Sequence, residues 1–564
     1  MKKHIVEFSF LGILVACHFL FWQFMHYGYL NYAYANAYFD TSFDLLEEAF
    51  ISSQMMQYVE NFLLAFFRWS WLGCTILLLP IISTYFIAKD ILKRLNFDSF
   101  KILAFFPAIT MMLSQHSVHF FLQKSLVVLL IIIAMYLHII FKDKKFRFFL
   151  TIGIFFVFFF LSKLEIVLLC ISLLIIELLV SKDKQRYVLV GLHFLFAVFL
   201  LILYKIETPT TPKFQTEILI LIALQTFPIL LFALLANLKK SYVFSNKKIV
   251  FLYILIAIGI GSTFISNNGL EKEELYARLD IALLNDDFDE ILFLTKNTKL
   301  EKQEDLYPYT FYALAKKGQL SQSLFQYKVN LSNFLVEPMP LYTNNKTILS
   351  ICFYQSLGLL NEAIHQAFQK SISKKRGDNF RALCLLVDLN MAKGNFILVE
   401  KNLAKLEQTL VHTDFVQSRR KMILSKKAEF KEVDFNNYLH IEKDQFLNIS
   451  YALFLAKNDS QFVKDYFLCS LLLTGDYSAF CSAYNDFYSA DCRKRVYAEA
   501  LVMARDMGIY KSYFTAPNKV EQDWYMFKSI LGNQLISLQE REKRLSIFRN
   551  TWWYYYLKEY EHLF

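Results

Sequence analysis

Two aspartates near the start of the chain are the side chains whose surroundings best suit catalysis. Asp40 and Asp44 belong to a segment, residues 26–68, that contains five acidic residues and no basic residue before Arg68. A carboxylate in such a segment can act as a general base or ligate a divalent metal ion. The alternative is structural, because "DTSFD" is also a pattern that starts a helix, where short polar side chains cap exposed N–H groups.

Four more charged residues form the candidate substrate-binding set: Arg68, Lys124, Lys163 and Glu165. Their basic groups could hold the phosphate of a lipid. Lys163 and Glu165 interrupt an apolar run over residues 148–180, and ionisable groups at membrane depth are candidates for function. Anchoring explains the same residues, since long basic side chains reach from apolar surroundings to the lipid headgroups.

A pair of histidines is the candidate metal site. The motif "QHSVH" places His116 and His119 three residues apart, so both imidazoles can share one face of a helix. Neutral imidazoles are common metal ligands. Two histidines do not complete a site, however, and the HExxH pattern of zinc proteases is absent from the sequence. Histidines that hydrogen-bond at the membrane surface are the alternative interpretation, and a divalent metal ion is the one cofactor that the sequence suggests.

Membrane helices must position these residues. Nine apolar segments are candidate spans: about 8–25, 69–88, 102–115, 119–141, 148–162, 164–180, 188–204, 216–238 and 249–266. Some are short, which a locally thin bilayer or burial inside a bundle permits. The charges at 162–165 then separate two spans instead of interrupting one long helix. The sequence therefore predicts a bundle of about nine transmembrane helices.

The connecting segments alternate in charge. Five of them, "MKKH", "KDILKRLNFDSFK", "KDKKFR", "SKDKQR" and "KKSYVFSNKK", carry 17 of the 22 Lys and Arg residues before residue 267. Cytoplasmic loops attract such an excess, so we expect a cytoplasmic N-terminus. The predicted location is a bacterial inner membrane, with residues 1–266 as the transmembrane domain and residues 267–564 as a periplasmic domain. Membrane lipid is thus an expected partner.

The surplus of positive charge belongs to the membrane half. Residues 1–266 contain 22 basic and 14 acidic residues, whereas residues 267–564 contain 38 and 36. A nucleic-acid-binding protein should carry its basic face on a soluble domain, so we expect no nucleic-acid partner. In the first outer loop, residues 26–68, apolar residues recur at helical spacing from Phe43 to Phe67, which predicts amphipathic helices along the membrane surface.

Short helical patterns repeat in the second half. Their predicted turns lie at Asn285, Gly318, Gly358, Gly394 and Gly475. The first four turns are 33, 40 and 36 residues apart, which indicates stacked helical hairpins of the tetratricopeptide kind. Such arrays present a concave surface suited to recognition. The aromatic run "TWWYYY" near the C-terminus fits packing on this array, with a membrane-interface or sugar-stacking role as alternatives. The predicted class is therefore all-α.

Three stretches of the sequence resemble a known family. They are "SLGLLNEAIHQAFQ" (356–369), "LNMAKGNFILVEKNLAKLEQTL" (389–410) and "TWWYYY" (551–556). The family comprises uncharacterised membrane proteins of Bacteroidota, grouped as domain of unknown function 6057. The resemblance extends over the whole layout, a multi-span half followed by a helical outer half, and it implies no established activity.

Two hypotheses for the function remain open. The layout is also similar to that of multi-span glycosyltransferases that use lipid-linked sugars, which place an acidic first outer loop beside the membrane. That similarity implies Asp40 or Asp44 as the base, Lys124 or Lys163 on the lipid pyrophosphate, and a polyprenyl-linked sugar as substrate. The alternative is a non-catalytic scaffold, whose helical array binds envelope or secretion proteins.

Overall fold

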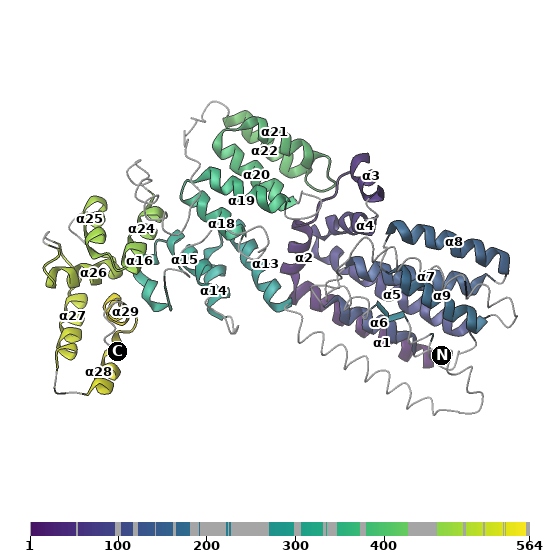
Figure 1. The fold of residues 1–564 in the computed structure, drawn as a ribbon, viewed down its shortest axis with the longest axis horizontal. Coiled ribbons are helices and arrows are strands. Elements are labelled where there is room, and N and C mark those ends of the chain that lie inside the picture. Colours follow the sequence, from purple (N-terminus) through teal and green to yellow (C-terminus); the bar gives the residue numbers. More distant parts are fainter. Residues whose placement is uncertain are drawn as a thin grey trace. The chain divides into compact units, whose positions relative to one another are not determined.

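In the structure, a computed structural model, every regular element of the described residues is a helix (Figure 1). The described residues are 2–51, 55–95, 103–116, 122–141, 143–161, 165–180, 270–297, 306–330, 347–372, 380–426, 460–488, 492–510, 514–533 and 537–559, with the single positions 191, 222, 223, 225, 226, 230, 334 and 535. Their one β contact is an isolated antiparallel bridge between Asp40 and Thr409. The all-α prediction is confirmed for this part of the chain.

The first part of the chain forms long apolar helices joined by shorter ones. In order these are α1 (Lys2–Leu20), a π-helical turn (Phe21–Met25), α2 (Tyr27–Ala35), α3 (Phe43–Ile51), α4 (Met55–Leu64), a 3₁₀ turn (Ala65–Arg68), α5 (Ser70–Arg94), α6 (Phe105–Gln115), α7 (Leu122–Ile140), α8 (Lys144–Leu161) and α9 (Ile166–Val180). Within the described ranges, three stretches are long and apolar enough to cross a membrane: Glu7–Met25, Ser70–Arg94 and Leu122–Ile140. Val167–Leu179 is apolar but shorter.

The apolar run at 148–180 forms two helices. Because α8 ends at Leu161 and α9 begins at Ile166, the predicted break is confirmed, although Lys163 lies outside the described residues. The predicted spans 188–204, 216–238 and 249–266 also lie outside them, apart from six single positions.

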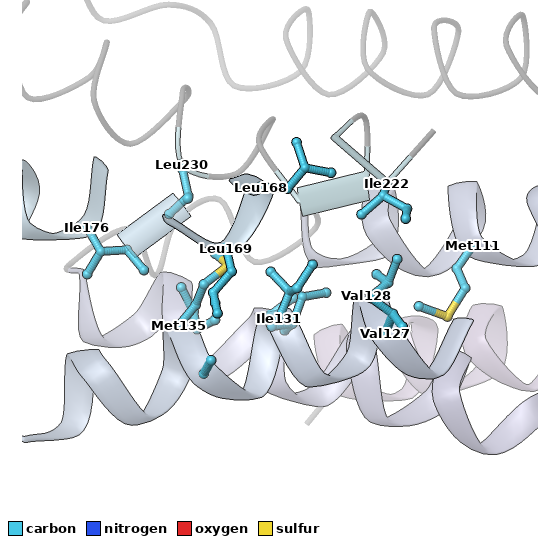
Figure 2. Close-up of a cluster of buried hydrophobic side chains, with 14 of the residues drawn as sticks. Met111, Val127, Val128, Ile131, Met135, Leu168, Leu169, Ile176, Ile222 and Leu230 are labelled. Atoms are coloured by element: carbon cyan, nitrogen blue, oxygen red, sulfur yellow. The ribbon is translucent and has the colours of Figure 1, made fainter. Parts of the chain in front are cut away.

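Side chains of α6, α7 and α9 form the core of this helical bundle (Figure 2). Val127, Ile131 and Met135 recur every four residues on α7, so they share one buried face. Met111 of α6 and Leu169 of α9 belong to the same fully buried cluster. Between membrane helices, close van der Waals packing of this kind supplies much of the association free energy.

The chain divides into two compact units. The first comprises residues 1–277 together with two short segments from later in the chain, 379–381 and 403–422. The second comprises residues 278–378, 382–402 and 423–564. The first unit is therefore completed by residues that lie more than a hundred positions beyond its main segment.

The second half of the chain is a series of short helices. They are α13 (Leu270–Leu284), α14 (Phe288–Asn297), α15 (Tyr307–Lys316), α16 (Leu320–Ser323), α18 (Thr347–Ser356), α19 (Leu360–Ile372), α20 (Phe380–Lys393), α21 (Phe396–Glu407), α22 (Thr413–Lys426), α24 (Gln461–Leu473), α25 (Tyr477–Phe487), α26 (Arg495–Asp506), α27 (Asn518–Leu531), α28 (Leu538–Leu545) and α29 (Trp552–Glu559).

Successive helices are joined by the predicted turns. Gly318, Gly358, Gly394 and Gly475 all have positive φ, between 67° and 80°. Glycine reaches this left-handed conformation without a Cβ clash, so it ends one helix and lets the next fold back. In the first turn the left-handed residue is Asp286, next to the predicted Asn285. Gly508, between α26 and α27, makes a similar turn that the repeat spacing did not predict.

The C-terminal aromatic run packs in the interior of the second unit. Trp552 and Trp553 are fully buried, and the indole N–H of Trp553 donates to the carbonyl of Glu499 on α26 at 2.7 Å. The backbone N–H of Trp552 donates to the Glu499 carboxylate at 2.8 Å. The packing interpretation of "TWWYYY" is therefore confirmed for both tryptophans.

Candidate functional site

Asp40 occupies the turn that leads into α3. Its side chain is 7% exposed, and both carboxylate oxygens accept hydrogen bonds from near neighbours. The Tyr38 hydroxyl donates to Oδ2 at 2.8 Å, while the backbone N–H and hydroxyl of Ser42 donate to Oδ1 at 3.0 and 2.6 Å. The Ser42 hydroxyl oxygen in turn accepts from the N–H of Leu45 at 3.4 Å. Asp40 thus holds the start of α3, as the helix-start interpretation predicts.

Asp44 faces an open hollow on α3. The hollow has a volume of about 310 Å³ and is lined by Asp44, Glu47, Glu48 and Ile51. Residues three and four apart share a helix face, so the three carboxylates lie close together. They form no ion pair with any basic side chain in the described part of the chain. Asp44 also lies in the first turn of α3, where the helix dipole favours negative charge.

The two ends of α3 expose large apolar side chains. Phe43 and Ile51 are among the most exposed large side chains of the first unit. Phe50 stacks on Phe160 of α8, with ring centroids 4.3 Å apart. A helix with acids on one face and exposed aromatic side chains elsewhere has the pattern of a membrane-surface helix.

The two basic residues of the predicted set that the structure describes, Arg68 and Lys124, have different partners. Arg68 donates to the carbonyl of Val411 and lies 3.6 Å from the carboxylate of Asp414. Lys124, at the start of α7, forms an ion pair of 2.5 Å with the buried Glu165. The structure therefore brings together Lys124 and Glu165, while Lys163 lies outside the described residues.

His116 lies in a buried cluster of histidines. Its Nε2 is 3.3 Å from Nδ1 of His18, the two rings are stacked, and Phe21 packs against His116 and His26. His119 lies outside the described residues. Among the residues that are described, no group of three or more His, Cys, Asp or Glu side chains is arranged to hold a metal ion. The metal hypothesis therefore gains no ligand from this cluster.

Two residues of the second half of the chain hold α2. The carboxylate of Glu274, on α13, accepts the N–H groups of Gly28 and Tyr29 at 3.1 and 2.6 Å. At the other end of α2, the Tyr34 hydroxyl is 2.8 Å from Nε2 of His412. Burial and then the positive charge of Arg68 lower the pKa of His412 to about 4, so the imidazole is neutral near pH 7.

A third polar cluster lies at the opposite end of α7. The carboxylate of Glu177, on α9, accepts from Arg147 of α8 at 2.8 Å and lies 3.1 Å from Nε2 of His138 of α7. All three side chains are buried. The charge of Glu177 is thus compensated by Arg147, which belongs to the predicted cytoplasmic segment "KDKKFR".

Sequence reasoning missed Glu274, His412 and His18. The partners of Glu274 and His412 are more than 240 residues away, so no local pattern could have shown them. His18 carried a weak signal, because it is one of the few polar side chains in the first apolar segment.

The chain matches the model of the family of unknown function DUF6057 over residues 2–559, and it therefore belongs to that family. No curated protein and no solved structure matches the chain. The family resemblance expected from the sequence is confirmed, and it carries no established activity.

Proposed function

We propose that this member of the DUF6057 family is a membrane glycosyltransferase that takes its sugar from a lipid-linked donor on the periplasmic side of a bacterial inner membrane. One observation carries the proposal: the carboxylates of Asp44, Glu47 and Glu48 line an open hollow on a helix that also exposes apolar side chains. A glycosyl acceptor needs a base for its hydroxyl proton, and a lipid-linked donor needs a site at the membrane surface.

The proposed roles draw on the contacts of the described residues and, for Lys163, on the sequence. Asp44 accepts the proton of the acceptor hydroxyl, while Glu47 and Glu48 orient the acceptor. Lys124 and Lys163 bind the pyrophosphate of the donor, with Glu165 fixing the Lys124 ammonium group. Asp40 keeps α3 in place and has no free oxygen for the acceptor.

The proposed topology is nine spans with residues 267–564 in the periplasm. Trp69 and Trp71, at the start of α5, are exposed as in the aromatic belt of a membrane–water interface. Phe149 and Phe156 lie seven residues apart on one exposed face of α8, which suits contact with lipid. These features support spans at α5 and α8, and the alternating loop charge supports the orientation.

The scaffold is the second candidate function. It is favoured by large apolar side chains on the surface of the helical hairpins, such as Phe293 at 58% and Ile397 at 84% exposure. Exposed apolar side chains on a repeat array fit the binding of envelope or secretion proteins. On this alternative, the tetratricopeptide-like array is the functional part and the α3 carboxylates only keep their helix solvated.

Single substitutions in the native host distinguish the two candidates. Asp44→Asn should reproduce the envelope-glycan and glycoprotein profile of a deletion strain, because the amide cannot take the acceptor proton. Asp40→Asn should have a smaller effect, and Glu271→Gln, an exposed acid on α13, serves as the matched control. All variants must accumulate normally. A deletion strain with unchanged glycans would remove the support for an enzyme, and the array would then be used to isolate partners.

A further inference from the structure

We infer that Glu274 and His412 are positioning residues for the outer-loop site, because they hold α2 at its two ends and thereby set the path of the chain into α3. This inference rests on the proposed function for its catalytic consequence. Neither residue lines the hollow of Asp44, so neither is assigned a part in the reaction itself.

Glu274 fixes the start of α2. The first N–H groups of a helix have no partner within the helix, and here those of Gly28 and Tyr29 are bound by Oε1 and Oε2 of one carboxylate. Glu274 is 6% exposed, so these charge-assisted bonds lie away from water. The helix dipole adds to the attraction. Because each oxygen binds a different N–H, both the position and the direction of the first turn are set.

His412 fixes the end of α2 through a chain of hydrogen bonds whose directions can be assigned. The Thr409 hydroxyl donates to the carbonyl of Leu406 at 2.6 Å, so its oxygen accepts from Nδ1–H of His412 at 3.1 Å. Nε2 of the neutral imidazole is then an acceptor, and the Tyr34 hydroxyl donates to it at 2.8 Å. The rings of Tyr34 and His412 are also stacked, with an angle of 4° between their planes.

The chain between α2 and α3 continues this contact. The carbonyl of Ala37 accepts from the N–H of Phe380 at 3.0 Å, Asp40 forms its bridge with Thr409, and the N–H of Thr41 donates to Gln408 at 3.2 Å. These bonds end two residues before α3 begins. The turn that places the α3 carboxylates is therefore bound to the same short segment as the end of α2, and α2 connects this turn to Glu274.

Hydrogen exchange in the full-length protein in lipid nanodiscs tests the inference directly. In Glu274→Ala and His412→Ala, we expect amides of residues 27–51 to exchange at least about tenfold faster. A tenfold change corresponds to a loss of about 1.4 kcal/mol of local stability. Amides of α7 should not change. Glu271→Ala on α13 and Gln417→Ala on α22, the helix that begins directly after His412, are exposed positions and serve as the matched controls.

Conservative variants, together with the glycan profile as a second readout, separate positioning from general destabilisation. Glu274→Gln and His412→Gln keep an acceptor oxygen, so they should restore part of the protection and of the wild-type glycan profile. Unchanged exchange at 27–51, or equal acceleration in α7, would overturn the inference. If exchange changes as expected but a deletion strain has normal glycans, the positioning stands and the proposed function fails.

Discussion

Three buried carboxylates, two in the first unit and one in the second, are used in different ways. In the first unit, Glu274 and Asp40 accept hydrogen bonds from backbone N–H groups of α2 and of the turn before α3. In the second, Asp465 of α24 accepts from the side chains of Lys494 and Tyr497, at 2.8 and 2.7 Å. The first arrangement fixes the path of a connecting segment, whereas the second fixes the packing of helices.

This difference implies that the two kinds of site lose stability in different ways. When a carboxylate that binds backbone N–H groups is removed, the segment that carries these N–H groups can open locally. The surrounding helices keep their own packing. A buried ion pair between helices leaves an uncompensated charge when one member is removed, and the cost falls on the unit as a whole. Substitutions of the backbone-binding carboxylates should therefore have local effects, and substitutions in the buried ion pair should have global effects.

The largest effect is expected for Asp465→Ala. Asp465 is fully buried and the side chain of Lys494 is 25% exposed, so removal of the carboxylate leaves a mostly buried cation without its partner. The expected loss is about 3–5 kcal/mol of unfolding free energy for the second unit. Denaturant titration with exchange at α24–α26 measures it. Equal loosening of residues 27–51 would contradict the division into two responses.

The next effect is a pH dependence at Glu499. Burial raises the pKa of this carboxyl from its usual 4.5 to about 7, despite the bonds from Trp552 and Arg495. Between these values the folded protein holds a proton that the unfolded chain has lost, so stability falls as the pH rises from 4.5 to 7. The expected change is about 3 kcal/mol over this window. Glu499→Gln should flatten the dependence in denaturant titrations of the second unit at pH 5 and 8.

The first unit should respond to pH in the opposite direction. The folded pKa of His412 is about 4 against the usual 6.5, so between these values the opened state binds a proton that the folded state excludes. Stability of the contact therefore falls as the pH falls, by about 2 kcal/mol at pH 5. Exchange of residues 27–51, corrected for intrinsic rates, should accelerate on acidification. In His412→Gln this response should disappear, and a response that persists would assign it to another group.

The smallest effect is expected for a surface ion pair of the second unit. Asp506 accepts from Lys528 at 2.7 Å, but the two side chains are 32% and 55% exposed. Exposed pairs contribute about 0–1 kcal/mol. Asp506→Asn should therefore shift the unfolding free energy by less than about 1 kcal/mol, which makes it the control for Asp465→Ala. A loss comparable with that of Asp465→Ala would show that burial does not explain the difference.

The elements that could be predicted from sequence are those set by neighbouring residues. The start of α3 follows from Asp40 and Ser42, and the turns at Gly318 and Gly475 follow from the conformational freedom of glycine. The break between α8 and α9 follows from the charges at 162–165 and the length of a span.

The contacts that could not be predicted join residues far apart in the chain. Glu274 looked like one acid among several at the start of α13, and His412 lay in a polar turn between α21 and α22. Their roles depend on tertiary packing, which hydrophobic periodicity does not encode. The pairing of Lys124 with Glu165 was partly accessible, because both residues were placed at the same membrane surface, but the contacts of Arg68 with Val411 and Asp414 were not.

The π-helical turn at the end of α1 has a consequence for how the chain length can vary. The N–H of His26 donates to the carbonyl of Phe21, five residues back, so this turn holds one residue more than an α-helical turn. Deleting one residue from 21–25 would let the turn close with regular α-helical winding, and the chain that follows would keep its direction. A deletion within the regular part of α1 would instead rotate the residues on its two sides by about 100° relative to one another. The π-helical turn is therefore the place where this helix can best accommodate a change of one residue in its length.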